Sequence, residues 1–142
     1  MTAIPDAPDT FPLMGAQATV LATADQTGDA WEMLELDLQP GARSPLHTLD
    51  ADKLFTVVDG DVTIVLGDST QIYGRGPVFV PAGTPHCYRN ESNAPARMTV
   101  TVTGRGQVEF LRGMSRLAAG GPPDPAAVAE HARAHGVVIL PS

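Results

Sequence analysis

Two histidines and one lysine are the residues of this sequence whose types and spacing could do chemistry together. His47, Lys53 and His86 lie in short segments that alternate apolar and polar residues or are wholly apolar. An imidazole can ligate a metal or move a proton. A lysine amine can hold an anion as a fixed cation, exchange a proton, or form a Schiff base with a carbonyl group. We expect the fixed-cation role, which requires least; an outward-facing surface lysine, one residue out of register, is the alternative.

The same residues belong to two longer patterns of fixed spacing. The first pattern consists of Gly41, His47 and Gly60. The second consists of Pro81, Gly83, His86 and Asn90. On these positions the sequence resembles the cupin superfamily, from about residue 31 to residue 103, and in particular its small quercetin-dioxygenase-like monocupins. The resemblance implies an all-β fold, the cupin double-stranded β-helix or jelly-roll barrel, with a short C-terminal α-helix.

The resemblance also implies a metal site, and this chain departs from it. Family members use two histidines and a glutamate from the first motif and one histidine from the second. Here Leu49 stands at the second histidine position and Lys53 at the glutamate position. His47 and His86 are the ligands if any metal binds, with iron, manganese, zinc or nickel as the alternative cofactor. Because a metal site needs about three protein ligands, we expect no tightly bound metal.

Alternation along the strands predicts which other side chains face the interior of the barrel. His47 shares one face with positions 49, 53, 55 and 57, and His86 shares the facing one with Tyr88. Arg43 could guide an anion at the mouth of the barrel. The predicted substrate contacts are Arg43, Leu49, Phe55 and Tyr88.

Short strands joined by turns must position these residues. Fourteen glycines and thirteen prolines punctuate the chain, which is typical of a sandwich or barrel. We predict strands over residues 18–22, 31–38, 54–58, 62–66, 78–80, 87–90 and 98–103. Asp59-Gly60, a dipeptide that accepts positive φ easily, predicts a hairpin between 54–58 and 62–66.

The last quarter of the chain predicts a helix over residues 124–136, with Asp124 as N-cap and Pro125 in its first turn. His131 and His135 share one helix face, but no third ligand is near in sequence, and an imidazolium suits a helix C-terminus. We therefore expect a structural role for this pair. Residues 136–140 predict a closing strand. The predicted organisation is an N-terminal arm (1–16), a barrel (17–112) and a C-terminal helix with a closing segment (113–142).

Composition restricts the partners. Nine basic and sixteen acidic residues give a net charge of −7, which disfavours nucleic acid and anionic membranes. The single Cys87 excludes an internal disulfide. No apolar run approaches the roughly 20 residues of a membrane span, and the N-terminus lacks the features of a signal peptide. We expect a cytoplasmic protein, and the resemblance implies a homodimer.

Three functions follow as hypotheses. The leading one is an enzyme of isomerase, cyclase or lyase type, acting on a small carbonyl-bearing or anionic organic substrate without a tightly bound metal. In it, His47, Lys53 and His86 are the catalytic residues. The alternatives are a metal-dependent dioxygenase of the quercetinase-like type and a non-catalytic barrel that binds a small ligand.

Overall fold

Strand β3 (Trp31–Leu38) shows how the alternating sequence builds the core. Its residues alternate between buried and more exposed positions, and Leu34, Leu36 and Leu38 are buried. Its neighbour β10 (Ala96–Thr103) pairs with it over eight residues and alternates in the same way. The two-residue period of a strand therefore directs one face of this sheet to the core.

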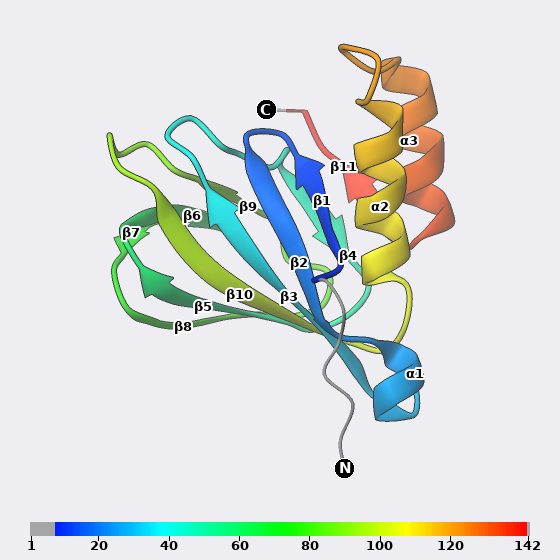
Figure 1. Ribbon diagram of the computed structural model, residues 1–142, viewed down its shortest axis with the longest axis horizontal. Coiled ribbons are helices and arrows are strands. Elements are labelled where there is room, and N and C mark those ends of the chain that lie inside the picture. Colours follow the sequence, from blue (N-terminus) through cyan, green and yellow to red (C-terminus); the bar gives the residue numbers. More distant parts are fainter. Residues whose placement is uncertain (1–7, 142) are drawn as a thin grey trace.

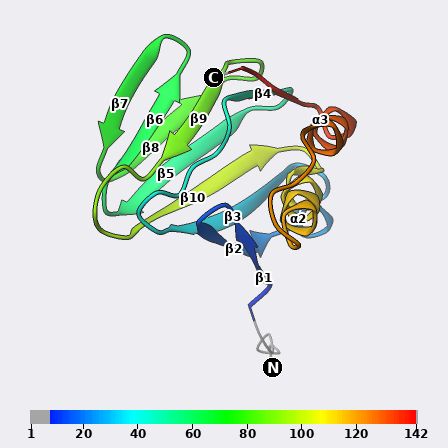
Figure 2. The same cartoon turned by 90° about the horizontal axis from the view of Figure 1, so that it is seen from above.

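Two facing sheets enclose that core in the computed structural model, which describes residues 8–141 (Figures 1 and 2). One sheet has six strands in the order β1-β2-β3-β10-β5-β8, and the other has five in the order β11-β4-β9-β6-β7. The remaining strands are β1 (Thr10–Leu13), β2 (Ala16–Ala22), β4 (His47–Leu49), β5 (Lys53–Asp59), β6 (Val62–Leu66), β7 (Ser69–Tyr73), β8 (Gly76–Val80), β9 (His86–Arg89) and β11 (Val137–Ile139). The predicted all-β jelly-roll architecture is confirmed.

The predicted N-terminal arm is only partly an arm. Thr10–Leu13 forms β1, which pairs with β2, and Ala16 already begins β2. Pro12 lies in this edge strand, where its missing N–H group is tolerated. Residues 1–7 of the predicted arm lie outside the described part of the chain.

The hairpin predicted at Asp59-Gly60 is wrong. Strand β5 pairs with β10 and β8, whereas β6 pairs with β7 and β9, so the turn carries the chain from one sheet to the other. Gly60 has a φ of 77°, and a Cβ there would lie 2.8 Å from the carbonyl oxygen of Pro95. The two-residue hairpin comes later, at Gly67-Asp68 between β6 and β7. Turn chemistry located a turn but did not identify the partner strand.

Helix α2 (Gln107–Leu117), which packs at one end of the sheets (Figure 2), was not predicted. Its N-cap, Gly106, has no side chain to cap the helix. The buried carboxylate of Glu32 instead accepts hydrogen bonds from the N–H groups of Gly106 and Val108. The boundary predicted between residues 112 and 113 falls inside this helix. A short helix, α1 (Ala24–Thr27), precedes β3.

Helix α3 (Pro125–Ala134) confirms the predicted C-terminal helix, with Asp124 as its N-cap. The Nε2–H group of His131 donates to the carbonyl oxygen of Phe110 at 2.9 Å, and its ring stacks on the Phe110 ring. His135 donates from Nδ1 to the carbonyl oxygen of His131 at 3.0 Å. The two contacts of His131 with Phe110 pack α3 against α2, and β11 pairs with β4 as the predicted closing strand.

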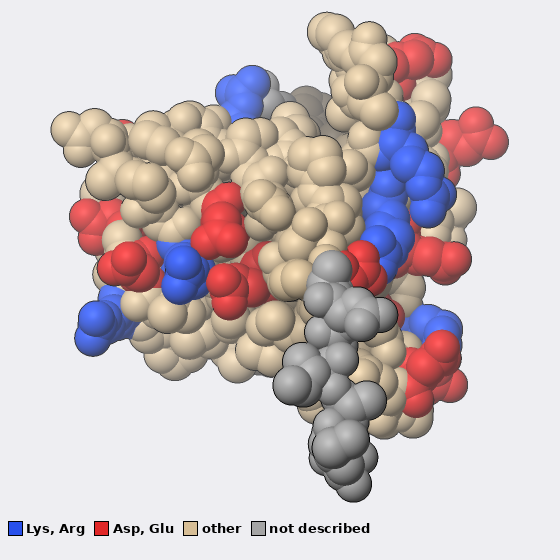
Figure 3. Space-filling model, in the orientation of Figure 1, with Lys and Arg blue, Asp and Glu red and all other residues tan. Residues whose placement is uncertain are grey.

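Positive and negative side chains are interspersed on the face shown in Figure 3. One cluster joins neighbouring strands, because Arg97 on β10 lies 3.2 Å from Glu35 and 3.1 Å from Asp37 on β3. Within residues 8–141, no helix has the length and apolar character that a membrane crossing requires.

Candidate active site

The side chains of His47, Lys53 and His86 meet inside the barrel. His47 on β4 lies directly opposite His86 on β9, and their ring centroids are 4.3 Å apart. Lys53 reaches them from β5 in the other sheet. Its Nζ atom lies 3.3 Å from Nε2 of His47 and 2.8 Å from Nε2 of His86. The structure therefore brings together the three residues predicted as catalytic.

Backbone carbonyl groups fix the tautomer of both imidazoles. The Nδ1–H group of His47 donates to the oxygen of Pro45 at 2.7 Å, and that of His86 donates to the oxygen of Thr84 at 2.8 Å. A carbonyl oxygen can only accept, so Nδ1 carries the hydrogen and each neutral ring presents the lone pair of Nε2 to Lys53.

Burial keeps both imidazoles neutral. Burial and the nearby charge of Lys53 lower the pKa of His47 from 6.5 to about 3, with a smaller contribution from His86. The same two causes lower the pKa of His86 from 6.5 to about 4. Both rings are thus hydrogen-bond acceptors towards Lys53 at neutral pH.

Lys53 is the only lysine in the sequence, and its side chain is 4% exposed. It pairs in register with Val80 on β8 and Val102 on β10, and it shares the inward face of β5 with Phe55. The outward-facing alternative is therefore wrong. Burial lowers the pKa of Lys53 from 10.5 to about 7, so this amine takes both protonation states near neutral pH.

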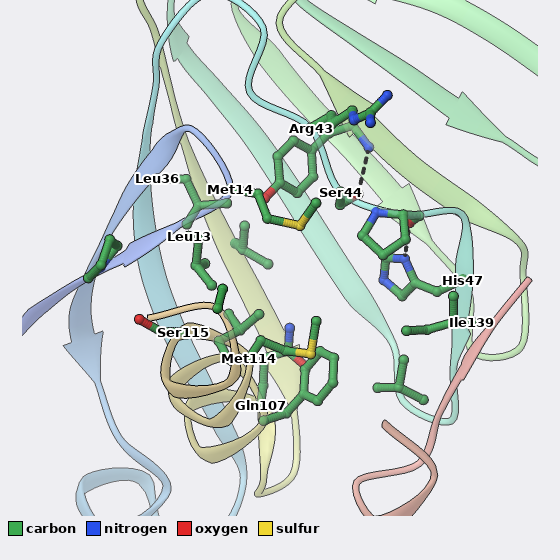
Figure 4. A pocket seen from close by; sticks show the side chains of 18 of the residues that line it. Leu13, Met14, Leu36, Arg43, Ser44, His47, Gln107, Met114, Ser115 and Ile139 are labelled. Carbon is green, nitrogen blue, oxygen red and sulfur yellow. Dashed lines mark hydrogen bonds between the residues drawn. The ribbon is translucent and has the colours of Figure 1, made fainter. Parts of the chain in front are cut away.

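A cavity of about 450 Å³ lies between the sheets and α2, and Lys53 and His47 form part of its wall. Figure 4 shows His47 and Ile139 on one side of this space and Leu13 and Leu36 on another. Most of the lining is apolar. The polar lining residues are Arg43, Ser44, His47, Lys53, Tyr88, Gln107 and Ser115.

Three of the four predicted substrate contacts line this cavity. Phe55 and Tyr88 face it with their rings edge to face, at a centroid distance of 6.1 Å, and Arg43 lines it with an exposed side chain. Burial raises the pKa of Tyr88 to about 12, so its hydroxyl group keeps its proton. Leu49 is the exception: it pairs with Val137 of β11 and borders a separate shallow hollow outside the cavity.

Gln107 is a cavity residue that the sequence analysis missed. It begins α2, is 8% exposed, and its Oε1 atom is buried without a hydrogen-bond partner in the described structure. A buried carbonyl oxygen without a partner carries a free-energy cost of about 1–3 kcal/mol. It is therefore a ready acceptor for a donor group on a bound molecule. No local sequence signal marks it, because α2 is capped by the distant Glu32.

The side chains at the barrel centre do not fit the metal site that the resemblance implies. Both Nε2 atoms, the atoms that would bind a cation, lie within hydrogen-bond distance of the Lys53 amine. Within residues 8–141, no three His, Cys, Asp or Glu side chains are grouped so that they could hold a metal ion. The donor set is two imidazoles and an amine, without the carboxylate that would balance the charge of a divalent cation, and both imidazole lone pairs are directed at the amine hydrogens.

Most of the barrel matches a known protein family. The family model of the cupin domain matches residues 34–102. The chain is 35% identical over 95 residues to quercetin 2,3-dioxygenase of Bacillus subtilis, covering 65% of this chain and 28% of that protein. It is 35% identical over 69 residues to Phomopsin biosynthesis cluster protein C' of Diaporthe leptostromiformis, covering 48% of this chain and 36% of that one. The chain thus spans roughly a third of the length of these relatives.

Solved structures share the fold over 65% to 75% of the chain. An RmlC-like cupin from Shewanella frigidimarina superposes with a TM-score of 0.65 at 13% identity, over 75% of this chain and 93% of that one. The polyketide cyclase RemF from Streptomyces resistomycificus superposes with a TM-score of 0.63 at 20% identity. The superposition covers 72% of this chain and 79% of the cyclase. A sugar phosphate isomerase from Silicibacter pomeroyi superposes with a TM-score of 0.57 at 26% identity. The superposition covers 65% of this chain and 61% of the isomerase.

Proposed function

The chain belongs to the cupin superfamily, and we propose that its barrel is an acid–base enzyme that acts on a small carbonyl-bearing molecule without a bound metal. The reaction class is proton transfer next to the carbonyl group, which leads to isomerisation or cyclisation. The observation that carries this proposal is the position of the Lys53 amine, between two imidazole Nε2 atoms and in the wall of an apolar cavity.

An amine at this position is suited to proton transfer. A general acid or base works best when its pKa is near the working pH, and burial lowers the pKa of Lys53 to about 7. The amine can take a proton from the carbon beside a carbonyl group, and the ammonium form can give one back. His47 and His86 orient the amine by accepting its hydrogens.

The cavity defines the class of substrate. Its volume of about 450 Å³ lies in the range of small-molecule sites, which is roughly 300–1,000 Å³. Its walls favour an apolar skeleton, while Gln107 offers an acceptor and Tyr88 a donor. One similar structure, at 26% identity, is described as a sugar phosphate isomerase, which supports the reaction class; the apolar lining favours a less polar substrate.

Exchange of carbon-bound hydrogen tests this proposal directly. We would purify the untagged protein, measure its metal content, remove any metal with a chelator and incubate it with small aldehydes and ketones in D₂O. We expect NMR to detect exchange next to the carbonyl group for some of these compounds. In Lys53→Met the exchange rate should fall about 10²-fold or more, whereas Arg116→Met, a change at an exposed residue of α2, should leave it unaltered.

Two results would contradict the proposal. Turnover that needs stoichiometric iron, manganese, zinc or nickel would instead support the metal-dependent dioxygenase. Saturable binding of a compound with no exchange or other turnover would support the non-catalytic barrel.

A further inference from the structure

We propose that Lys53 is a nucleophile, and that it forms a Schiff base with the aldehyde or ketone group of a molecule held in the cavity. This inference rests on the proposed function, because it needs a carbonyl compound in the cavity. It goes further by making the contact covalent and by restricting the substrate class to aldehydes and ketones, since acids and esters do not form imines with an amine.

The hydrogen bonds around Nζ leave the lone pair of the amine available. A neutral amine has two N–H groups, and the structure offers two acceptors, the Nε2 atoms of His47 and His86. Neither Nε2 carries a hydrogen, because Nδ1 of each ring donates to a backbone oxygen. No proton donor among the described residues is therefore within hydrogen-bond distance of the lone pair.

The surroundings of Lys53 favour that neutral form. An ammonium group would have a third N–H and a full charge, and none of the ion pairs among the described residues includes Lys53. Beyond the two imidazoles, the ring centroid of Phe55 lies 5.4 Å from Nζ. A buried charge without a counter-charge is unfavourable, in agreement with the lowered pKa of this amine.

The chemical step needs no further reactant. The lone pair of Nζ attacks the carbonyl carbon, a C–N bond forms, and the π electrons of the C=O bond move to oxygen, which takes up a proton. The proton on this oxygen comes from nitrogen through Nε2 of a neighbouring imidazole, and the carbinolamine then loses its hydroxyl group as water together with the second proton of nitrogen as the C=N bond forms. The product is an imine, and its protonated form withdraws electrons from the adjacent carbon. That withdrawal makes the adjacent C–H acidic, and since the Lys53 nitrogen is then part of the imine, water or Nε2 of a neighbouring imidazole takes the proton in its place.

The single lysine makes the test unambiguous, because the N-terminus is the only other amine in the chain. We would incubate the metal-free full chain with a short 2-alkanone, benzaldehyde or a 1,3-diketone, and reduce with cyanoborohydride at neutral pH. The adduct would be located by peptide mass spectrometry. We expect Lys53 to be modified about 10-fold or more faster than the N-terminal amine, since Lys53 is positioned in the wall of the cavity and is partly neutral at this pH. Arg116→Met should give the same pattern.

Two controls separate failure of this inference from failure of the proposed function. Lys53→Arg and Lys53→Met should lose the adduct while each variant still unfolds in a single cooperative thermal transition. Hydrogen exchange without any reducible adduct at Lys53 would overturn the Schiff base and leave the acid–base enzyme standing. Modification confined to the N-terminus, or modification of Lys53 only after unfolding in urea, would overturn it as well.

Discussion

Nζ of Lys53 lies 2.8 Å from Nε2 of His86, in the interior of the barrel. The imidazole lone pair that a cation would use is directed at an amine hydrogen, and His47 holds the same amine at 3.3 Å. The replacement of a carboxylate by an amine therefore alters the chemistry of the whole centre. Two imidazoles that could ligate a metal ion instead accept hydrogen bonds from the Lys53 amine, which can exchange protons.

Stability should rise with pH between neutral and mildly alkaline conditions because of Lys53. The pKa of Lys53 is about 7 in the folded protein and 10.5 as its ordinary value. Between these values the unfolded chain binds more protons, so the free energy of unfolding increases with pH. We expect it to increase by about 2 kcal/mol from pH 7 to pH 9 in the wild type relative to Lys53→Met. Urea unfolding at both pH values measures this difference, and parallel pH profiles of the two proteins would contradict it.

Both buried histidines should resist protonation in mild acid. Their pKa values are about 3 for His47 and about 4 for His86, compared with 6.5 for an ordinary histidine. Their contribution to stability is therefore complete above pH 6.5 and is lost as the pH falls towards these lower values. Nitrogen-15 NMR should show two neutral rings protonated at Nδ1 at pH 5.5. A ring that titrates with a midpoint near 6.5 and is assigned to either residue would be inconsistent with the hydrogen-bond pattern.

Gly113 should be required for the contact between α2 and α3. A Cβ at this position would lie 2.1 Å from the ring of His131, which is fixed by its hydrogen bond to Phe110. We expect Gly113→Ala to lower the free energy of unfolding by about 1–3 kcal/mol. In a His131→Ala background the same change should be neutral or stabilising, because alanine is the better helix former by about 1 kcal/mol. Equal effects in both backgrounds, measured by urea unfolding, would show that the two residues are not coupled.

Gln107 should support ligand binding at a cost to the stability of the fold. Replacing it with leucine removes a buried oxygen without a partner, so Gln107→Leu should raise the free energy of unfolding by about 1 kcal/mol. The same variant should weaken the binding of those ketones that undergo exchange in the wild type and carry a hydroxyl or amine donor. Gln71→Leu, at an exposed position of β7, is the matched control. A less stable Gln107→Leu protein would mean that the amide supports the fold.

The centre of the barrel could be predicted because it depends on local and periodic features. Alternation along β5 turns Lys53 and Phe55 to the same side, and the fixed spacing around His47 and His86 indicated that both rings face the interior. A strand period of two determines such orientations once one residue is placed.

The missing elements depend on contacts between distant segments. Helix α2 begins where Glu32, more than 70 residues earlier, binds its first N–H groups, so no pattern near Gln107 indicates a helix start. The turn at Gly60 connects two sheets because Val62 begins a strand that pairs with β7 and β9. Leu49 shares a face with His47, yet it lies outside the cavity, at a position that pairs with Val137 from the end of the chain. Partner choice at long range is not encoded in turn residues.

The titration of a single NMR signal tests the central claim most directly. Because the chain contains one lysine, protein labelled with nitrogen-15 only in lysine side chains gives one Nζ resonance. We predict that its chemical shift titrates with a midpoint near 7, the pKa that burial gives this amine, and that Gln71→Leu, a change at an exposed residue of β7, preserves the midpoint. A midpoint close to the ordinary value of 10.5 would mean that the side chain is solvated and charged, and would contradict the account.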